Sequence, residues 1–405
     1  MIELVDSALA GRAVVFGSLP PEARDLDLLV RGADAEGLGA RLAEEGFIRR
    51  RREWARFRGC AVELVDVVVA HAWALAQDEL DALFDDAVPL EDRTHLVRPA
   101  PHHALLILAR SEARGQGELS DKRRLRVDRA LSEDPQAWQR AFAHAPRWRL
   151  EQALANLRAA HATGARPVTA RVRRVRGRLT ARRRGRVISL SGIDGSGKSS
   201  QANALRETLE TLGYEAAVEW TRLSYNPSLD LIGAPVKAVL RAAQRLRSHS
   251  VPATESTADP GKTLRRRSVF VTHVWAAIVA LANASSQRRA TRRHLARGRV
   301  VICDRYTLDS TIHLRYRYGA ARRFRFQASL IRALSPRPLR SFFLDVPPAL
   351  GLARKAEQYD LAQLTQQVGL YHEEYERLGA RRLDGERPRE ELCADIAREV
   401  WLALP

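Results

Sequence analysis

The chain of 405 residues, with 45% hydrophobic and 28% charged residues, is too long for one ordinary core and too apolar for a disordered or fibrous protein. Its three cysteines lie far apart, and its amino terminus has no basic stretch followed by an apolar run. These features argue against a disulfide scaffold and a secretion signal. We therefore expect a cytoplasmic protein of two domains.

The net charge of +19 would attract phosphates, nucleic acid or an anionic membrane. The 62 arginines are spread over the whole chain, however, which a general preference for arginine would also produce. A general preference for arginine is the favoured explanation, and the charge alone does not identify a binding partner.

The first 110 residues combine short apolar stretches with one helical stretch. Residues 12–18, 25–30 and 61–69 predict strands, and residues 34–47 predict a helix between the second and third of them. This order favours a small α+β domain.

Two acidic residues belong to the second of these strands. Asp25 and Asp27 alternate along it, so both carboxylates would face one side and could hold Mg²⁺ under a triphosphate. Asp66, or less well Glu63, would add a third carboxylate from a neighbouring strand. With Gly17-Ser18 before them, these acids resemble the nucleotidyltransferase fold of the DNA polymerase β type. The alternative is a pair of solvated acids, or a fold used only for binding.

Residues 111–165 predict a helical extension, with breaks near Pro135 and Pro146. The helical pattern already begins at His102-His103, which has no partnered Cys or His spacing. A place at a helix start or on the surface is therefore favoured over metal binding.

Residues 166–186 contain ten arginines and no acidic residue. Such a run repels itself and resists packing, so we place an interdomain linker at residues 166–185. A strap that faces phosphate, nucleic acid or a membrane is the alternative, and is less favoured.

From residue 186 to residue 405, apolar strands alternate with helices. Residues 186–191, 299–303 and 340–346 predict strands buried on both sides, and residues 197–213 predict the first helix. This alternation predicts an α/β domain with a parallel sheet and flanking helices.

A glycine-rich turn lies between the first strand and the first helix of this domain. It fits the phosphate-loop pattern GxxxxGK[ST], in which backbone N–H groups, a helix N-terminus and a lysine surround the phosphates of a nucleoside triphosphate. A compact ammonium can follow the β- and γ-phosphates as they separate, which a planar guanidinium cannot do as well. The residues expected around ATP are Gly192, Asp194, Gly195, Ser196, Gly197, Lys198, Ser199 and Ser200, with Ser199 on Mg²⁺.

Two further pairs follow later strands. Asp304 would hold Mg²⁺, and the adjacent Arg305 would bind an acceptor phosphate, because open α/β sheets bind ligands at the carboxyl ends of their strands. Arg354-Lys355 would close over the transferring phosphoryl group. Taken singly, each pair also has a non-functional explanation: Asp-Arg is a common dipeptide, and Arg354-Lys355 could be a solvated helix end.

The three motifs together resemble the thymidylate kinase family of P-loop nucleoside monophosphate kinases. The resemblance implies transfer of the γ-phosphoryl group of Mg·ATP to a small monophosphate, with Lys198, Asp304, Arg305 and Arg354 as catalytic residues. Asp194, Arg305 and, as a weaker match, Arg222 would bind the acceptor. The resemblance also allows a homodimer.

The departures from that family concern the acceptor side. Residues 221–235, 307–319 and 356–367 lack the family's usual acceptor and lid motifs. The chemistry is therefore better supported than the substrate. A nucleotide-gated regulatory module and a bifunctional protein with nucleotidyltransferase activity remain alternatives.

Overall fold

The fold is described from a computed structural model, which covers residues 1–21, 23–113, 120–163, 185–220, 269–319, 324–355 and 360–405. Contacts divide the chain into two compact units. Unit 1 comprises Met1–Arg58 and Val62–Arg182, and unit 2 comprises Gly59–Ala61 and Arg183–Pro405. The predicted linker at residues 166–185 lies, apart from Gly185, outside the described residues.

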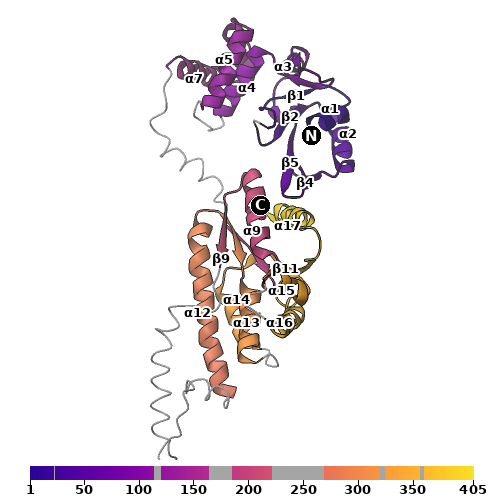
Figure 1. Cartoon of the computed structure of the whole chain (residues 1–405). Coiled ribbons are helices and arrows are strands. Elements are labelled where there is room, and N and C mark those ends of the chain that lie inside the picture. The colour runs from indigo at the N-terminus through magenta and orange to yellow at the C-terminus, as the bar shows by residue number, and fades with distance from the viewer. Residues whose placement is uncertain (22, 114–119, 164–184, 221–268, 320–323, 356–359) are drawn as a thin grey trace, which may run out of the picture. The chain divides into compact units, whose positions relative to one another are not determined.

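Unit 1 contains a seven-stranded mixed sheet in the order β3-β4-β5-β2-β1-β7-β6, followed by a group of helices (Figure 1). Its strands are β1 (Ala13–Val15), β2 (Leu26–Val30), β3 (Ile48–Arg50), β4 (Glu53–Arg58), β5 (Ala61–Val69), β6 (Val88–Pro89) and β7 (Leu96–Arg98). Its helices are α1 (Ile2–Ala8), α2 (Gly32–Glu44), the 3₁₀ helix η1 (Ala70–Trp73), α3 (Gln77–Asp85), α4 (Pro101–Ala113), α5 (Asp121–Glu133), α6 (Ala137–Trp148) and α7 (Glu151–Ala162).

Alternating side chains bury both faces of this sheet. Val14 and Leu29, which are register partners on antiparallel β1 and β2, pack in the core that includes the helices α4–α7. Their neighbours Val15 and Leu28 pack in a second core with residues of α1 and α2. Because successive side chains of a strand point to opposite faces, the short apolar strands supply both cores.

Two sequence-based expectations for unit 1 need correction, and a third is confirmed. Two strands that the sequence analysis did not predict, β3 and β4, lie between the predicted helix and the third predicted strand. They were missed because their arginine-rich sequences show little apolar alternation. Asp25 lies in a bend just before β2 rather than within it. The predicted breaks near Pro135 and Pro146 are confirmed: α5 ends at Glu133 and α6 begins at Ala137, and α6 ends at Trp148, before a turn at Arg149 with a left-handed backbone (φ 56°).

Unit 2 has a five-stranded sheet in the order β12-β11-β8-β10-β9, in which all neighbours are parallel. Its strands are β8 (Arg186–Ser191), β9 (Ala216–Trp220), β10 (Val300–Asp304), β11 (Pro338–Asp345) and β12 (Arg381–Asp384). Its helices are α9 (Lys198–Thr211), α12 (Val269–Ala296), α13 (Thr307–Tyr318), α14 (Arg325–Leu334), α15 (Pro348–Arg354), α16 (Leu361–Glu374) and α17 (Arg389–Ala403).

Helices cover both faces of this sheet. α9 contacts β8, β9, β10 and α17, while α12 contacts the same three strands together with α13 and α14 (Figure 1). The free thiols of Cys303 in β10 and Cys393 in α17 are buried. The strand order reverses direction at β8, so the loops after β8 and β10 emerge beside one another at the carboxyl edge, where such sheets bind ligands.

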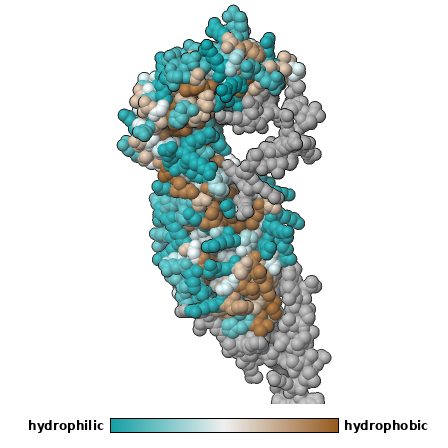
Figure 2. Space-filling model, turned by 180° about the vertical axis from the view of Figure 1, so that it is seen from behind, coloured by the Kyte–Doolittle hydropathy of each residue, from teal (hydrophilic) through white to brown (hydrophobic). Residues whose placement is uncertain are grey.

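Exposed large apolar side chains occur on several helices, including Leu125 of α5, Leu281 of α12 and Phe326 of α14. The surface in Figure 2 mixes hydrophilic residues with smaller hydrophobic groups. None of the described helices combines the length and the apolar character needed to cross a membrane.

Candidate functional site

The turn between β8 and α9 is held in a shape that only glycine adopts easily. Gly195 and Gly197 have φ angles of 82° and 87°, and Gly197 caps the amino terminus of α9. A Cβ atom at Gly195 would lie 2.3 Å from the carbonyl oxygen of Gly351 in α15. The turn therefore lies directly against α15, and its backbone is fixed at the positive end of the α9 dipole.

Lys198 is buried beside this turn. Its Nζ donates hydrogen bonds to the carbonyl oxygens of Gly192, at 2.9 Å, and Ile193, at 2.6 Å. Burial, reinforced by the positive charge of Arg305, lowers the pKa of Lys198 to about 8. The ammonium is thus charged at neutral pH but held in a site that disfavours its charge, and an added anionic phosphate would relieve that cost.

Ser199 and Asp304 lie together at the edge of the sheet. The Ser199 hydroxyl, in the first turn of α9, donates a hydrogen bond to Oδ2 of Asp304, the last residue of β10. Oδ1 of Asp304 is buried and has no hydrogen-bond partner among the described residues. One hydroxyl and one carboxylate with a spare buried oxygen form a donor set that suits Mg²⁺, which prefers oxygen ligands and retains several waters.

Arg305 follows immediately and has a left-handed backbone (φ 73°), unusual for a residue with a side chain. Its guanidinium forms an ion pair with Asp194 of the glycine-rich turn. Burial opposes its charge, but the carboxylates of Asp309 and Asp194 outweigh burial and raise the pKa of Arg305. A permanent cation is therefore held beside the turn, with a carboxylate partner that an acceptor could replace or share.

Asp309 is a site residue that the sequence analysis missed. Its two carboxylate oxygens accept hydrogen bonds from the Ser191 hydroxyl (2.6 Å), the Gly192 N–H (3.3 Å), the Tyr306 N–H (3.0 Å) and the Tyr371 hydroxyl (2.7 Å). One buried carboxylate thus joins the end of β8, the start of α13 and helix α16. The available signal was an acidic residue at the third position of a helix, which is common and not specific.

The other expected residues are less closely engaged. Arg354, at the end of α15, has its Nη1 atom 3.5 Å from the carbonyl oxygen of Gly195. Ser196 is buried, whereas Ser200 is exposed on α9. Arg222 lies outside the described residues.

The acidic residues of unit 1 fall into two groups. Asp27 and Asp66 are register partners on parallel strands β2 and β5, and both line a cavity of about 460 Å³. Asp25 does not line that cavity and instead pairs with Arg24. Glu63 is also turned elsewhere, since it binds the Arg56 side chain at 2.6 Å.

Charges of both signs line this cavity. Burial is the largest cause that raises the pKa of Asp27 and of Asp66 to about 6; the charge of Asp25 adds to the shift of Asp27, and the charge of Asp27 adds to that of Asp66. Arg126 also lines the cavity, and burial lowers its pKa. A Cβ atom at Gly17 would lie 2.2 Å from Oδ2 of Asp27, so the backbone approaches this carboxylate closely.

In unit 2, a parallel sheet, a glycine-rich turn before a helix, and a buried lysine with a serine–aspartate pair define the class of P-loop phosphate-binding proteins. No protein-family model matches the chain. Curated proteins do match it. The chain is 29% identical over 228 residues to a thymidylate kinase of Symbiobacterium thermophilum, covering 54% of this chain and 94% of that protein. It is 30% identical over 188 residues to a thymidylate kinase of Alcanivorax borkumensis, covering 45% of this chain and 75% of that protein.

A further match is a probable thymidylate kinase of Pyrococcus horikoshii, 29% identical over 171 residues, covering 42% of this chain and 70% of that protein. The chain belongs to the thymidylate kinase family. The similarity extends over about half of the chain, and it supports phosphoryl transfer of the nucleotide kinase kind.

Proposed function

We propose that unit 2 transfers the γ-phosphoryl group of Mg·ATP to a small phosphorylated acceptor, a nucleoside monophosphate of the dTMP type. The observation that carries this proposal is the convergence of Lys198, the Ser199–Asp304 pair and Arg305 at one edge of the sheet. A cation for the donor, an oxygen site for Mg²⁺ and a cation for the acceptor thus lie next to each other. Reactions of this kind need positioning and charge neutralisation more than covalent chemistry.

Each residue then has a definite role. Lys198 would leave its two carbonyl partners and follow the donor phosphates, while Ser199 and Asp304 would hold Mg²⁺, which would neutralise developing charge when bound. Arg305 binds the acceptor phosphate, and its partner Asp194 approaches the acceptor sugar. Arg354, beside the Gly195 carbonyl, covers the donor phosphates from α15.

The test measures ADP release from purified protein with Mg·ATP across a panel of nucleoside monophosphates that includes dTMP. Lys198→Met should abolish acceptor-dependent release, whereas Lys122→Met, which changes a lysine of unit 1, should leave it unchanged. Wild-type turnover in Lys198→Met would show that this turn is not the donor site. ATP binding without turnover on any acceptor would favour a nucleotide-gated regulatory module instead.

A second candidate function concerns unit 1. We propose that the Asp27–Asp66 pair binds a nucleoside triphosphate through Mg²⁺ and supports nucleotidyl transfer. The support is the pairing of two carboxylates on adjacent strands in one cavity, close to the cationic Arg126.

This activity separates cleanly from that of unit 2. Nucleotidyl transfer, measured as the transfer of label from an α-labelled triphosphate to an acceptor, should disappear in Asp27→Ala and persist in Lys198→Met. Loss in Lys198→Met with retention in Asp27→Ala would instead assign all turnover to unit 2.

A further inference from the structure

Two adjacent histidines at the start of α4 are buried without the partners that imidazoles need. His103 is fully buried, and neither of its ring nitrogens has a hydrogen-bond partner among the described residues. His102 is 6% exposed, and its Nδ1 lacks a partner in the same sense. Because buried polar groups are nearly always satisfied, these nitrogens point to an additional ligand.

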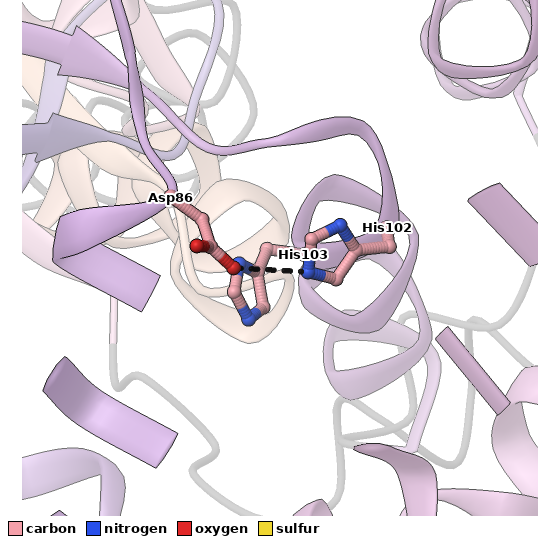
Figure 3. A group of neighbouring side chains, drawn as sticks. All are labelled: Asp86, His102 and His103. Carbon is pink, nitrogen blue, oxygen red and sulfur yellow. Dashed lines mark ion pairs between the residues drawn. The ribbon is translucent and has the colours of Figure 1, made fainter. Parts of the chain in front are cut away.

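A carboxylate completes the cluster from another element. Asp86 directly follows α3, and its Oδ2 lies 3.5 Å from Nε2 of His102 (Figure 3). One ligand atom from each of the three residues can be chosen so that all lie within 4.8 Å of one another. Ligand atoms of a tetrahedral Zn²⁺ site with bonds of about 2.1 Å are separated by about 3.4 Å. The His102–Asp86 distance already matches this value, and the 4.8 Å limit for the whole set leaves at most about 1.4 Å to close.

The surroundings fix the two imidazoles and keep them neutral. The rings of His102 and His103 are 4.1 Å apart, and His103 stacks on Trp148. Both side chains lie in the interior, where a charged imidazole is disfavoured. Neutral imidazoles carry the lone pair that a metal requires.

A third histidine nearby is already engaged. His144 lies 5.4 Å from the His102 ring, but its Nδ1 is 2.8 Å from a carboxylate oxygen of Glu79. Glu79 also accepts a hydrogen bond from the Trp148 indole at 2.8 Å. This network holds His144 and Trp148 in place and leaves the other two histidines and Asp86 as the available ligands.

We propose that Asp86, His102 and His103 bind one transition-metal ion of the Zn²⁺ type, with water at the fourth position. Two imidazoles and one carboxylate suit Zn²⁺ or Co²⁺ and are too soft a set for Mg²⁺. The side chain of Asp86 is 51% exposed, so it provides both an entry path and the mobility to close on the metal. The ion would join the end of α3 to the first turn of α4, and its role would be to stabilise unit 1.

The test uses the full chain, stripped with a chelator and titrated with Co²⁺ in excess Mg²⁺, which occupies the sites made of carboxylates alone. We expect one saturable equivalent with the visible absorption of tetrahedral Co²⁺, displaced by Zn²⁺. Asp86→Asn should weaken binding at least about tenfold, and His102→Gln should do the same. Zn²⁺ should raise the Tm of the wild-type chain but not that of Asp86→Asn.

The chain offers a matched control. Asp128 and His161 form another Asp–His pair, with 2.7 Å between Oδ1 and Nε2, and the Asp128 side chain is also 51% exposed. Asp128→Asn should leave Co²⁺ binding unchanged, because this pair has no second histidine close by among the described residues. Equal Co²⁺ affinity in Asp86→Asn and Asp128→Asn, or no saturable Co²⁺ binding, would show that the histidines are only packed core residues.

Discussion

At the scale of single residues, the site depends on side-chain shape as well as charge. Lys198 is one of only five lysines in the chain, and its ammonium is enclosed between two carbonyl oxygens. Arg305, which directly follows β10, pairs through its guanidinium with the carboxylate of Asp194. A compact ammonium and a planar guanidinium are therefore each used where their geometry fits.

Lys198→Arg tests this use of shape. The substitution keeps the charge but places a bulkier group where the carbonyl oxygens of Gly192 and Ile193 leave room for an ammonium. We expect kcat for acceptor-dependent ADP release to fall about 100-fold, as when one preorganised donor is lost. Lys122→Arg serves as the control, and retention of kcat in Lys198→Arg would show that charge alone suffices.

The acids of unit 1 predict a dependence of stability on pH. The pKa of Asp27 is about 6 in the folded protein against an ordinary value of 3.8. The folded state therefore favours the protonated carboxyl, and ionisation lowers the free energy of unfolding as the pH rises from about 4 to above 6. Asp27→Asn should therefore raise the free energy of unfolding by about 1–2 kcal/mol at pH 7.5, after allowance for its partial exposure, and by less at pH 4.5.

Chemical denaturation in EDTA at the two pH values measures this difference. Asp85→Asn, at a carboxyl that is 75% exposed, is the control and should change stability little. A loss of stability in Asp27→Asn at pH 7.5 would mean that the ionised carboxylate is stabilised in the fold rather than disfavoured.

At the scale of elements, the apolar strands and the glycine-rich turn were predictable because their signals are local. β8 and β10 are buried almost throughout, and their sequences are accordingly apolar runs. β12 has the sequence RRLD, with one buried leucine, and gives no such signal. Its pairing with β11 comes from the tertiary fold and could not be inferred from its own residues.

Contacts between distant segments were equally inaccessible. Asp309 lies 117 positions from Gly192, to whose N–H it is bonded, and no local pattern links the two. Asp86 meets His102 only because α3 ends beside the start of α4. Asp66, in contrast, was predicted from a neighbouring strand, and it is the register partner of Asp27, whereas the predicted pairing of Asp25 with Asp27 on one strand does not hold.

The link between α16 and the glycine-rich turn predicts a functional effect at a distance. The Tyr371 hydroxyl donates to Asp309, and it lies 3.1 Å from the carbonyl oxygen of Gly192. Tyr371→Phe keeps the ring, which stacks on Phe343 at 4.9 Å, but removes this link. We expect a loss of about 1–2 kcal/mol in stability and a higher KM for ATP.

Tyr375→Phe is the matched control, because that hydroxyl bonds only its neighbour Glu376 among the contacts described and lies at the surface. Thermal unfolding and the dependence of ADP release on ATP concentration give the two readouts. Equal effects of the two substitutions would remove Tyr371 from the support of the turn.

At the scale of the whole molecule, each unit has its own cores. Among the described residues, clusters of buried side chains such as those around Leu29 and Leu28 belong to unit 1, and separate clusters around Ile193, Ala280 and Val301 belong to unit 2. Domains with separate cores are in principle able to unfold separately. The proposed ligands also differ between the units, so each ligand should act on the unit that binds it.

Calorimetry of the full chain should accordingly show two transitions. A non-hydrolysable ATP analogue with Mg²⁺, at about 100 times its Kd, would stabilise unit 2 by about 2.7 kcal/mol and raise one transition by roughly 5–10 °C. Lys198→Met should remove this shift without moving the other transition. A single transition that moves as a whole would show that the units unfold together.

The buried thiol of Cys303 lies one residue before Asp304, in the strand that ends at the proposed Mg²⁺ site. Burial raises its pKa above the ordinary value, so the sulfur is neither accessible nor ionised while β10 keeps its place in the sheet. Its rate of alkylation therefore reports how often this strand opens. A bound nucleotide would slow that reaction, so the alkylation rate of Cys303 would report the occupancy of the neighbouring site.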